Sequence, residues 1–229
     1  MFNSQFEEDK LIQKFITENN IQVIPNIFEI GAADVSKNSN SRYFIESKDF
    51  TGYLFEPNTD FNQKLKDHYL ANKKVTIEPI VISDVDGEVS FDLQEDYTLS
   101  GIKDTGNTKV QSKRLKTYLD VNNLSSDIGI LSIDTEGYDS IILKSILEDK
   151  IFAQIVIIES SSNQETKAQE DLLIKNDYNK IFSTGRGSWA TKNIFLKVLR
   201  KTFKILGLTL PLRAVNTIWI QNKLANKDS

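Results

Sequence analysis

Five short, mostly apolar runs, each ending at an acidic or small polar residue, constrain the fold of this chain more than any other feature. The runs alternate with segments whose apolar residues recur at helical spacing, so they are predicted strands between predicted helices. Strands that are apolar throughout are typical of a parallel sheet with helices on both faces. The runs are 27–31, 53–57, 75–82, 128–134 and 155–159, with two further predicted strands at 178–183 and 217–221.

Length and composition limit the other classes. The 229 residues are predicted to form a single domain, with an N-terminal helical segment at 1–24 and an insertion at 185–213. The absence of cysteine excludes disulfides and zinc–thiolate sites. No apolar run approaches the roughly 20 residues that span a bilayer. The first nine residues are acidic and polar, unlike a secretory leader, so we expect a cytoplasmic protein.

The strand ends carry most of the polar chemistry. In an open α/β sheet, ligands bind outside the carboxyl ends of the strands. The groups at these ends are Glu29 to Asp34, Glu56, Ser83-Asp84, Asp134 to Gly137 and Glu159-Ser160. Any one acid could be explained by a cap or a solvated loop, but a series of five predicts a binding site along this edge.

The first loop discriminates between nucleotide ligands. A dinucleotide site needs G-x-G-x-x-G, whereas Gly31 is followed by two alanines and flanked by Glu29 and Asp34. Acids repel a pyrophosphate and favour the cationic sulfonium and ammonium groups of S-adenosylmethionine. Glu56, 25 residues beyond Gly31, can accept both ribose hydroxyls, but NAD enzymes share that spacing. An NAD-binding oxidoreductase and a non-catalytic binding protein of this fold therefore stay open as alternatives.

The ordered set of motifs resembles the FkbM family of methyltransferases. The motifs are Ser4-Gln5 with Asp9, 28–34, 39–41, Gly52 with 56–58, 83–87, 131–139 and 157–159, with a weaker echo at 216–223. The resemblance implies a class I methyltransferase (Rossmann-like) fold: a doubly wound, mostly parallel seven-stranded sheet with an antiparallel last strand. It also implies O-methylation of a hydroxyl on a sugar, a polysaccharide precursor or a related metabolite, with S-adenosyl-L-methionine as cofactor.

The resemblance also assigns a set of cofactor-binding residues. They are Glu29, Gly31, Asp34, Ser39, Asn40, Glu56, Pro57, Ser83, Asp84 and Asp134. The first loop would hold the methionine part, Glu56 the ribose, and Asp84 with Ser83 the adenine amino edge. Ser39 and Asn40 would hold the loop or the methionine carboxylate. Many class I enzymes have two or three glycines in this loop, so a single Gly31 leaves its conformation open.

The predicted catalytic residues are carboxylates. The only histidine, His68, falls in the middle of a predicted helix away from the strand ends, which leaves Asp134, Glu136 and Glu159 as candidate bases. Asp134 and Glu159 end adjacent strands about 4.8 Å apart, so they either share a proton or hold a divalent ion. We predict no metal. The alternative is that Asp134 accepts backbone amides while Glu136 caps the following helix.

The C-terminal part of the chain is strongly basic. Residues 178–229 contain ten basic residues and one acidic residue. The insertion at 185–213 is predicted to be an amphipathic helix that packs on the body or covers the site. Contact of 192–206 with an anionic membrane and a dimer contact are alternatives. We expect a small-molecule or glycan acceptor and no nucleic acid, because aromatic residues are not interleaved with the basic ones elsewhere.

Overall fold

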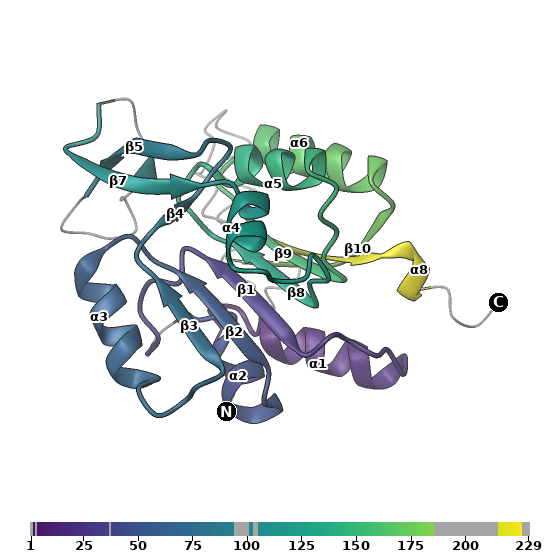
Figure 1. Cartoon of the computed structure of the whole chain (residues 1–229). Helices are drawn as coiled ribbons and strands as arrows, with labels where there is room; N and C mark the ends of the chain where they lie inside the picture. The colour runs from purple at the N-terminus through teal and green to yellow at the C-terminus, as the bar shows by residue number, and fades with distance from the viewer. Residues whose placement is uncertain are drawn as a thin grey trace, which may run out of the picture.

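The predicted strands form one seven-stranded sheet in the computed structural model, which describes residues 2, 4–36, 38–93, 101–102, 105–185 and 215–225. Its order is β10-β11-β9-β8-β1-β2-β3 (Figure 1). The strands are β1 (Asn26–Ile30), β2 (Thr51–Phe55), β3 (Val75–Glu78), β8 (Ile130–Ile133), β9 (Ile155–Ser160), β10 (Tyr178–Gly185) and β11 (Val215–Gln221). The central five strands are parallel, and β11 runs antiparallel to both β9 and β10. The predicted sheet with an antiparallel last strand is therefore confirmed.

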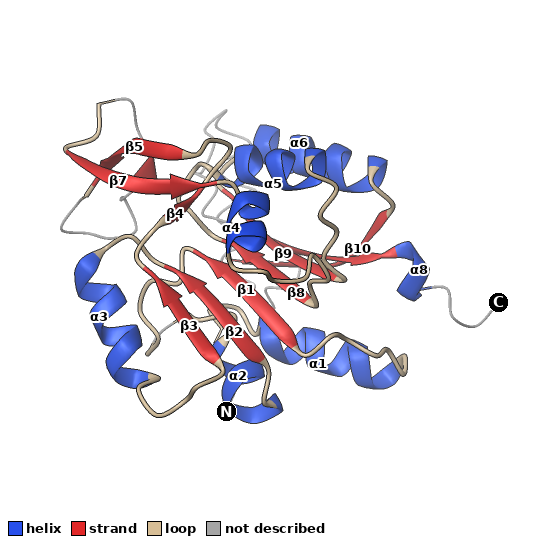
Figure 2. Ribbon diagram, in the orientation of Figure 1, coloured by secondary structure: helices blue, strands red, loops and turns tan. Residues whose placement is uncertain are grey.

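Helices cover both faces of this sheet (Figure 2). They are α1 (Glu8–Glu18), α2 (Arg42–Lys48), α3 (Thr59–His68), α4 (Leu115–Val121), α5 (Asp139–Glu148), α6 (Asn163–Lys175) and α8 (Asn222–Ala225). Successive side chains of a strand point to opposite faces, so Phe28 joins the core under α4, α5 and α6 while Ile27 joins the core under α1, α2 and α3. Burial on both faces explains why the strands are continuously apolar.

A second, four-stranded sheet differs from the sequence prediction. The predicted strand 75–82 is divided in two, because Pro79 has no N–H to donate to a strand ladder. Its second part is β4 (Val81–Ile82), which joins β5 (Gly87–Asp92), β6 (Gly101–Ile102) and β7 (Thr108–Lys113) in the order β4-β7-β5-β6. This sheet stands on the side to which the arrows of β1 to β3 point (Figure 1).

Two further predictions in this region were wrong. The Asp86-Gly87 turn and the alternating residues 88–93 predict a hairpin with the strand at 75–82, but β5 pairs with β7 and β6 instead. The polar sequence of 94–112 predicts an irregular segment, yet it contains β6 and most of β7. In β7 exposed polar positions alternate with half-buried ones, so its strand depends on pairing with β5 rather than on a local apolar signal.

The basic insertion predicted at 185–213 lies outside the described residues, apart from Gly185 at the end of β10. The suggested membrane contact at 192–206 falls entirely in that part. Within the described ranges, no helix is both long and apolar enough to traverse a bilayer.

Candidate active site

A cavity of about 370 Å³ opens at the carboxyl ends of β1, β2, β8 and β9. Its size is typical of a site for one small ligand. Three groups of residues form the walls: the strand ends, the second sheet and the segment before α1. The lining residues include Gln5, Phe6, Glu29, Gly31, Ala33, Glu56, Pro57, Asn58, Ile80, Val81, Ile82, Phe91, Ile102, Asp134, Glu136 and Glu159.

Gly31 sets the conformation of the first loop. Its φ of 84° lies in the left-handed region, and a Cβ there would stand 1.8 Å from the Asp134 carbonyl oxygen. The amides of Gly31 and Ala32 both donate to the Phe55 carbonyl, at 3.0 and 3.1 Å. One glycine therefore suffices for the close approach of β1, β2 and β8 at this point, which settles the conformation that the sequence left open.

The carboxylate of Glu29 is held by the loop before α2. It accepts hydrogen bonds from the Ser41 hydroxyl at 2.5 Å, the Asn40 amide at 2.8 Å and the Ser39 hydroxyl at 3.3 Å. Burial raises the pKa of Glu29 to about 7, although these hydrogen bonds favour the charged form. Ser39 and Asn40 thus hold the Glu29 carboxylate in place. Ser41 does the same, although it was not among the predicted cofactor-binding residues.

Glu56 lies at the end of β2 with both oxygens oriented. One accepts the Ala33 amide at 2.8 Å and the other the Asn58 amide at 2.7 Å. Burial raises the pKa of Glu56 to about 7. Each oxygen keeps a free lone-pair direction, and both Glu56 and Pro57 line the cavity. The geometry suits an acid that accepts two neighbouring hydroxyl groups.

The three predicted catalytic carboxylates come together. Asp134, Glu136 and Glu159 each offer an oxygen within 4.8 Å of the others. Burial of Asp134 and Glu159 beside each other favours a state in which one acid carries a proton that it donates to the other. Burial, and then the charge of Glu159, raise the pKa of Asp134 well above its usual value. Burial raises the pKa of Glu159 to about 7, although the hydrogen bond from Asp134 favours its charged form.

Asp139 was missed as a site residue and holds the loop that carries these acids. Its carboxylate accepts the amides of Thr135 at 2.9 Å and Gly137 at 3.1 Å. Burial raises the pKa of Asp139 to about 7. Glu136 is not the N-cap residue of the following helix, because α5 begins after Tyr138, whose side chain makes no capping hydrogen bond. An aspartate in the first turn of a predicted helix was the sequence signal for this role.

Replacing Asp139 with alanine is expected to destabilise the protein by about 1–3 kcal/mol, because it leaves two partly buried amides of the 135–137 loop without their acceptor. Urea unfolding measures the change. The matched control is Asp171→Ala on the exposed side of α6, which should leave the unfolding midpoint unchanged. Equal midpoints for both variants would contradict the role of Asp139.

Five predicted cofactor residues lie outside the cavity wall: Ser39 and Asn40, which hold Glu29, together with Ser83, Asp84 and Asp34. Ser83 is buried and hydrogen-bonded to the Ser112 hydroxyl at 2.6 Å. The Asp84 carboxylate accepts the Tyr138 hydroxyl at 3.1 Å. Asp34 accepts the amide and the hydroxyl of Ser36 within its own turn. Their contact with a cofactor stays a prediction.

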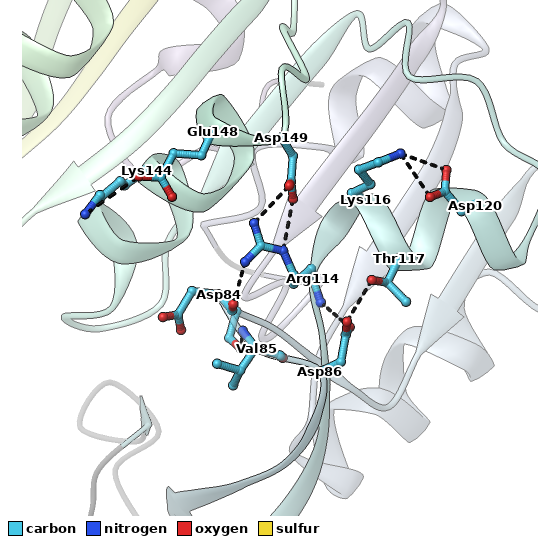
Figure 3. Close-up of polar contacts among 11 residues, drawn as sticks. Asp84, Val85, Asp86, Arg114, Lys116, Thr117, Asp120, Lys144, Glu148 and Asp149 are labelled. Carbon is cyan, nitrogen blue, oxygen red and sulfur yellow. Dashed lines mark hydrogen bonds and ion pairs between the residues drawn. The ribbon is translucent and has the colours of Figure 1, made fainter.

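Asp84 is fixed by a clamp around Arg114 (Figure 3). The guanidinium donates to the Asp84 carbonyl at 2.8 Å and to both oxygens of Asp149 at 2.9 and 3.1 Å, while the Arg114 amide donates to Asp86. The clamp ties the turn after β4 to the C-terminal end of α5.

The second sheet supplies an apolar wall that the sequence analysis did not predict. It consists of Ile80, Val81, Ile82, Phe91 and Ile102. The β6 end of this wall approaches the loop after β8, because a Cβ on Gly101 would lie 3.4 Å from the Glu136 carbonyl oxygen. Such a surface fits the flat face of a nucleobase.

The fit to S-adenosylmethionine follows from the side chains present. Five carboxylates, Glu29, Glu56, Asp134, Glu136 and Glu159, line the cavity and favour a cationic ligand. Glu56 and the apolar wall suit a ribose and a base. The strand order with an antiparallel β11, together with this edge of acids, defines a class I S-adenosylmethionine-dependent methyltransferase.

The family follows from the sequence match. A family model described as the Methyltransferase FkbM domain matches residues 29–185, and the chain belongs to this family. The chain is therefore a methyltransferase that uses S-adenosylmethionine. The alternatives of an NAD-binding oxidoreductase and of a non-catalytic binding protein are not retained.

Solved structures share the fold at low sequence identity. The METTL16 MTase domain aligns with a TM-score of 0.50 at 7% identity, over 94% of this chain and 66% of that one. A methyltransferase FkbM from Methylobacillus flagellatus KT gives 0.45 at 11% identity, over 86% of this chain and 43% of that one. A fibrillarin pre-rRNA processing protein from Methanococcus jannaschii gives 0.47 at 10% identity, over 93% and 76%. No curated protein matches the sequence.

Proposed function

We propose that this enzyme transfers the methyl group to a hydroxyl of a sugar, a polysaccharide precursor or a related metabolite. The observation that carries the proposal is that the acids Asp134 and Glu159 lie side by side at the cavity wall. An alcohol has a high pKa, so its oxygen must lose a proton as it attacks, and a carboxylate with a pKa near 7 is suited to accept it.

The residues then divide into separate tasks. S-adenosylmethionine supplies an electrophilic methyl group on a sulfonium, which becomes a neutral thioether after transfer. Glu159 accepts the hydroxyl proton, and Asp134 orients the Glu159 carboxylate through their hydrogen bond. Glu29 and Glu56 provide negative charge and hydrogen-bond acceptors for the cofactor.

Asp134, Glu136 and Glu159 also offer oxygen ligands for a divalent cation. We assign Asp134 and Glu159 to proton transfer, because burial raises the pKa of both acids, whereas a bound cation requires both acids ionised. Under this proposal, methyl transfer persists after treatment with EDTA.

The test is formation of S-adenosylhomocysteine from S-adenosylmethionine in the presence of a panel of nucleotide sugars and methyl glycosides. The proposal expects turnover with at least one member and a new methyl ether in the product by mass spectrometry. Methylation of nitrogen or carbon acceptors alone would overturn it.

The rate is expected to depend on pH. The raised pKa values of Glu29, Glu56 and Glu159, each about 7, mean that these acids become protonated below neutrality. Protonation removes both the base and the negative charge that attracts the cofactor. We expect kcat/KM for S-adenosylmethionine to fall by about tenfold between pH 8 and pH 6, since this ratio reports the free enzyme.

Unfolding does not explain such a loss. Folding raises the pKa of these three acids from their ordinary values to about 7. At a pH between those two values, the folded protein therefore binds more protons than the unfolded chain. Their contribution to stability is therefore fully present at low pH and is lost as pH rises through 7. A thermal melting temperature at pH 6 equal to or above that at pH 8, measured alongside the rates, is the control. A flat rate profile would contradict the assignment.

A further inference from the structure

The segment 4–8, here called the N-terminal strap, contributes to the cavity from outside the family-matched region. Gln5 and Phe6 line the cavity, although they precede β1 by about 20 residues and the family match begins at residue 29. Gln5 is exposed and Phe6 is half-buried. The strap is therefore a wall of the site that neither the strand ends nor the second sheet provides.

Glu8 anchors this strap. Its side chain is fully buried. One carboxylate oxygen accepts hydrogen bonds from the Thr184 hydroxyl of β10 at 2.5 Å and from the side-chain amide of Asn216 in β11 at 2.9 Å. The other oxygen accepts the backbone amide of Phe6 at 2.8 Å. A single carboxylate thus joins the backbone of the strap to two strands that lie more than 170 positions further along the chain.

A second contact fixes the turn of the strap. The Ser4 hydroxyl donates to Asp9 at 2.7 Å, and the Asp9 amide donates back to the Ser4 hydroxyl at 3.1 Å. Both ends of the segment that carries Gln5 and Phe6 are therefore held. Fixed ends orient the two intervening side chains for binding.

The contacts of Glu8 place the strap over the half of the sheet that carries Glu159, the proposed catalytic base. Asn216 lies opposite Glu159 in the β9–β11 ladder. The charge of Glu8 also acts on Asp134. Glu56 and the apolar wall of Ile80 to Ile82, which suit the nucleoside, lie at the β2 side and in the second sheet. The strap therefore borders the part of the cavity next to Glu159, where the acceptor hydroxyl must lie.

We propose that Gln5 and Phe6 bind the acceptor and that Glu8 is the positioning residue that holds them. The inference rests on the proposed function. The Gln5 amide both donates and accepts hydrogen bonds, which matches the hydroxyl groups of a sugar. The Phe6 ring offers an apolar face to the carbon-bound hydrogens of a pyranose.

The kinetic test compares Gln5→Ala and Glu8→Gln with the wild type and with Glu7→Gln, an exposed neighbour that makes an ion pair with Lys10. The acceptor is the panel member with the highest wild-type turnover. Gln5→Ala is expected to raise the acceptor KM about three- to tenfold, from loss of a hydrogen bond, and to leave the KM for S-adenosylmethionine within twofold. Glu8→Gln places an amide against the Phe6 N–H and is expected to lower kcat/KM for the acceptor about tenfold, while Glu7→Gln matches the wild type.

Two kinetic outcomes overturn the inference. One is a rise in the KM for S-adenosylmethionine equal to the rise for the acceptor. The other is wild-type behaviour of Gln5→Ala. Gln5 is exposed, so Gln5→Ala reports an effect on binding without the folding defect that a change at the buried Glu8 can cause.

A second measurement needs no acceptor. The chain has no cysteine, so Gln5→Cys introduces a single thiol whose alkylation by iodoacetamide can be followed by mass spectrometry. Saturating S-adenosylhomocysteine is expected to leave the alkylation rate within twofold. Protection of tenfold or more would place position 5 against the cofactor and overturn the inference. Failure of the wild type to bind S-adenosylhomocysteine would instead refute the methyl-transfer function itself.

Discussion

Glu159→Gln is expected to lower kcat by about 10²–10⁴-fold and to leave the Kd for S-adenosylhomocysteine within threefold, because glutamine cannot accept the acceptor's proton. The side chain is nearly isosteric and keeps the hydrogen bond to Asp134. Single-turnover kinetics and calorimetry measure the two quantities. The loss falls on kcat rather than on binding, since the interaction is made only as the proton moves.

The control for this variant is Glu148→Gln at the exposed end of α5, where the glutamate makes an ion pair with Lys144 at 3.7 Å. It should retain the wild-type rate. Should Glu159→Gln keep more than a tenth of the wild-type kcat, the base would have to be sought elsewhere. Asp134→Asn distinguishes the roles of the two acids. Its side-chain amide can still donate a hydrogen bond to Glu159, so kcat is expected to fall less than in Glu159→Gln.

Gly31→Ala is expected to abolish cofactor binding, with a Kd for S-adenosylhomocysteine raised at least about a hundredfold. Its Cβ would stand 1.8 Å from the Asp134 carbonyl oxygen, so β1 and β8 would have to separate at the cavity. The positive φ adds about 1–2 kcal/mol of backbone strain for any residue with a Cβ. Calorimetry and urea unfolding check both effects.

Gly87→Ala is the matched control. Gly87 also has a positive φ, 121°, but a Cβ there meets nothing within 4 Å. This variant should show the cost of backbone strain alone and bind S-adenosylhomocysteine like the wild type. If Gly31→Ala behaved like Gly87→Ala, close approach at the first loop would not control the site.

The central sheet and its line of acids were predictable from the sequence. Strands such as 155–159 are apolar on both faces, and parallel connections bring their carboxyl ends to one edge. Glu29, Glu56, Asp134 and Glu159 therefore had to meet there. Residue order and hydrophobicity carry this information because the side-chain alternation along a strand and the direction of a parallel connection are local properties.

Tertiary structure alone decided the rest of the site. The apolar wall depends on the pairing of β5 with β7, which are separated in the chain by β6. The strap depends on the hydrogen bonds of Glu8 with Thr184 and Asn216. The sequence predicted that Asp134 and Glu159 meet, but the raised pKa values of both acids arise from their burial in the folded chain. None of these has a local signal, because pairing between distant segments and the cost of burying a charge are fixed only when the whole chain is packed.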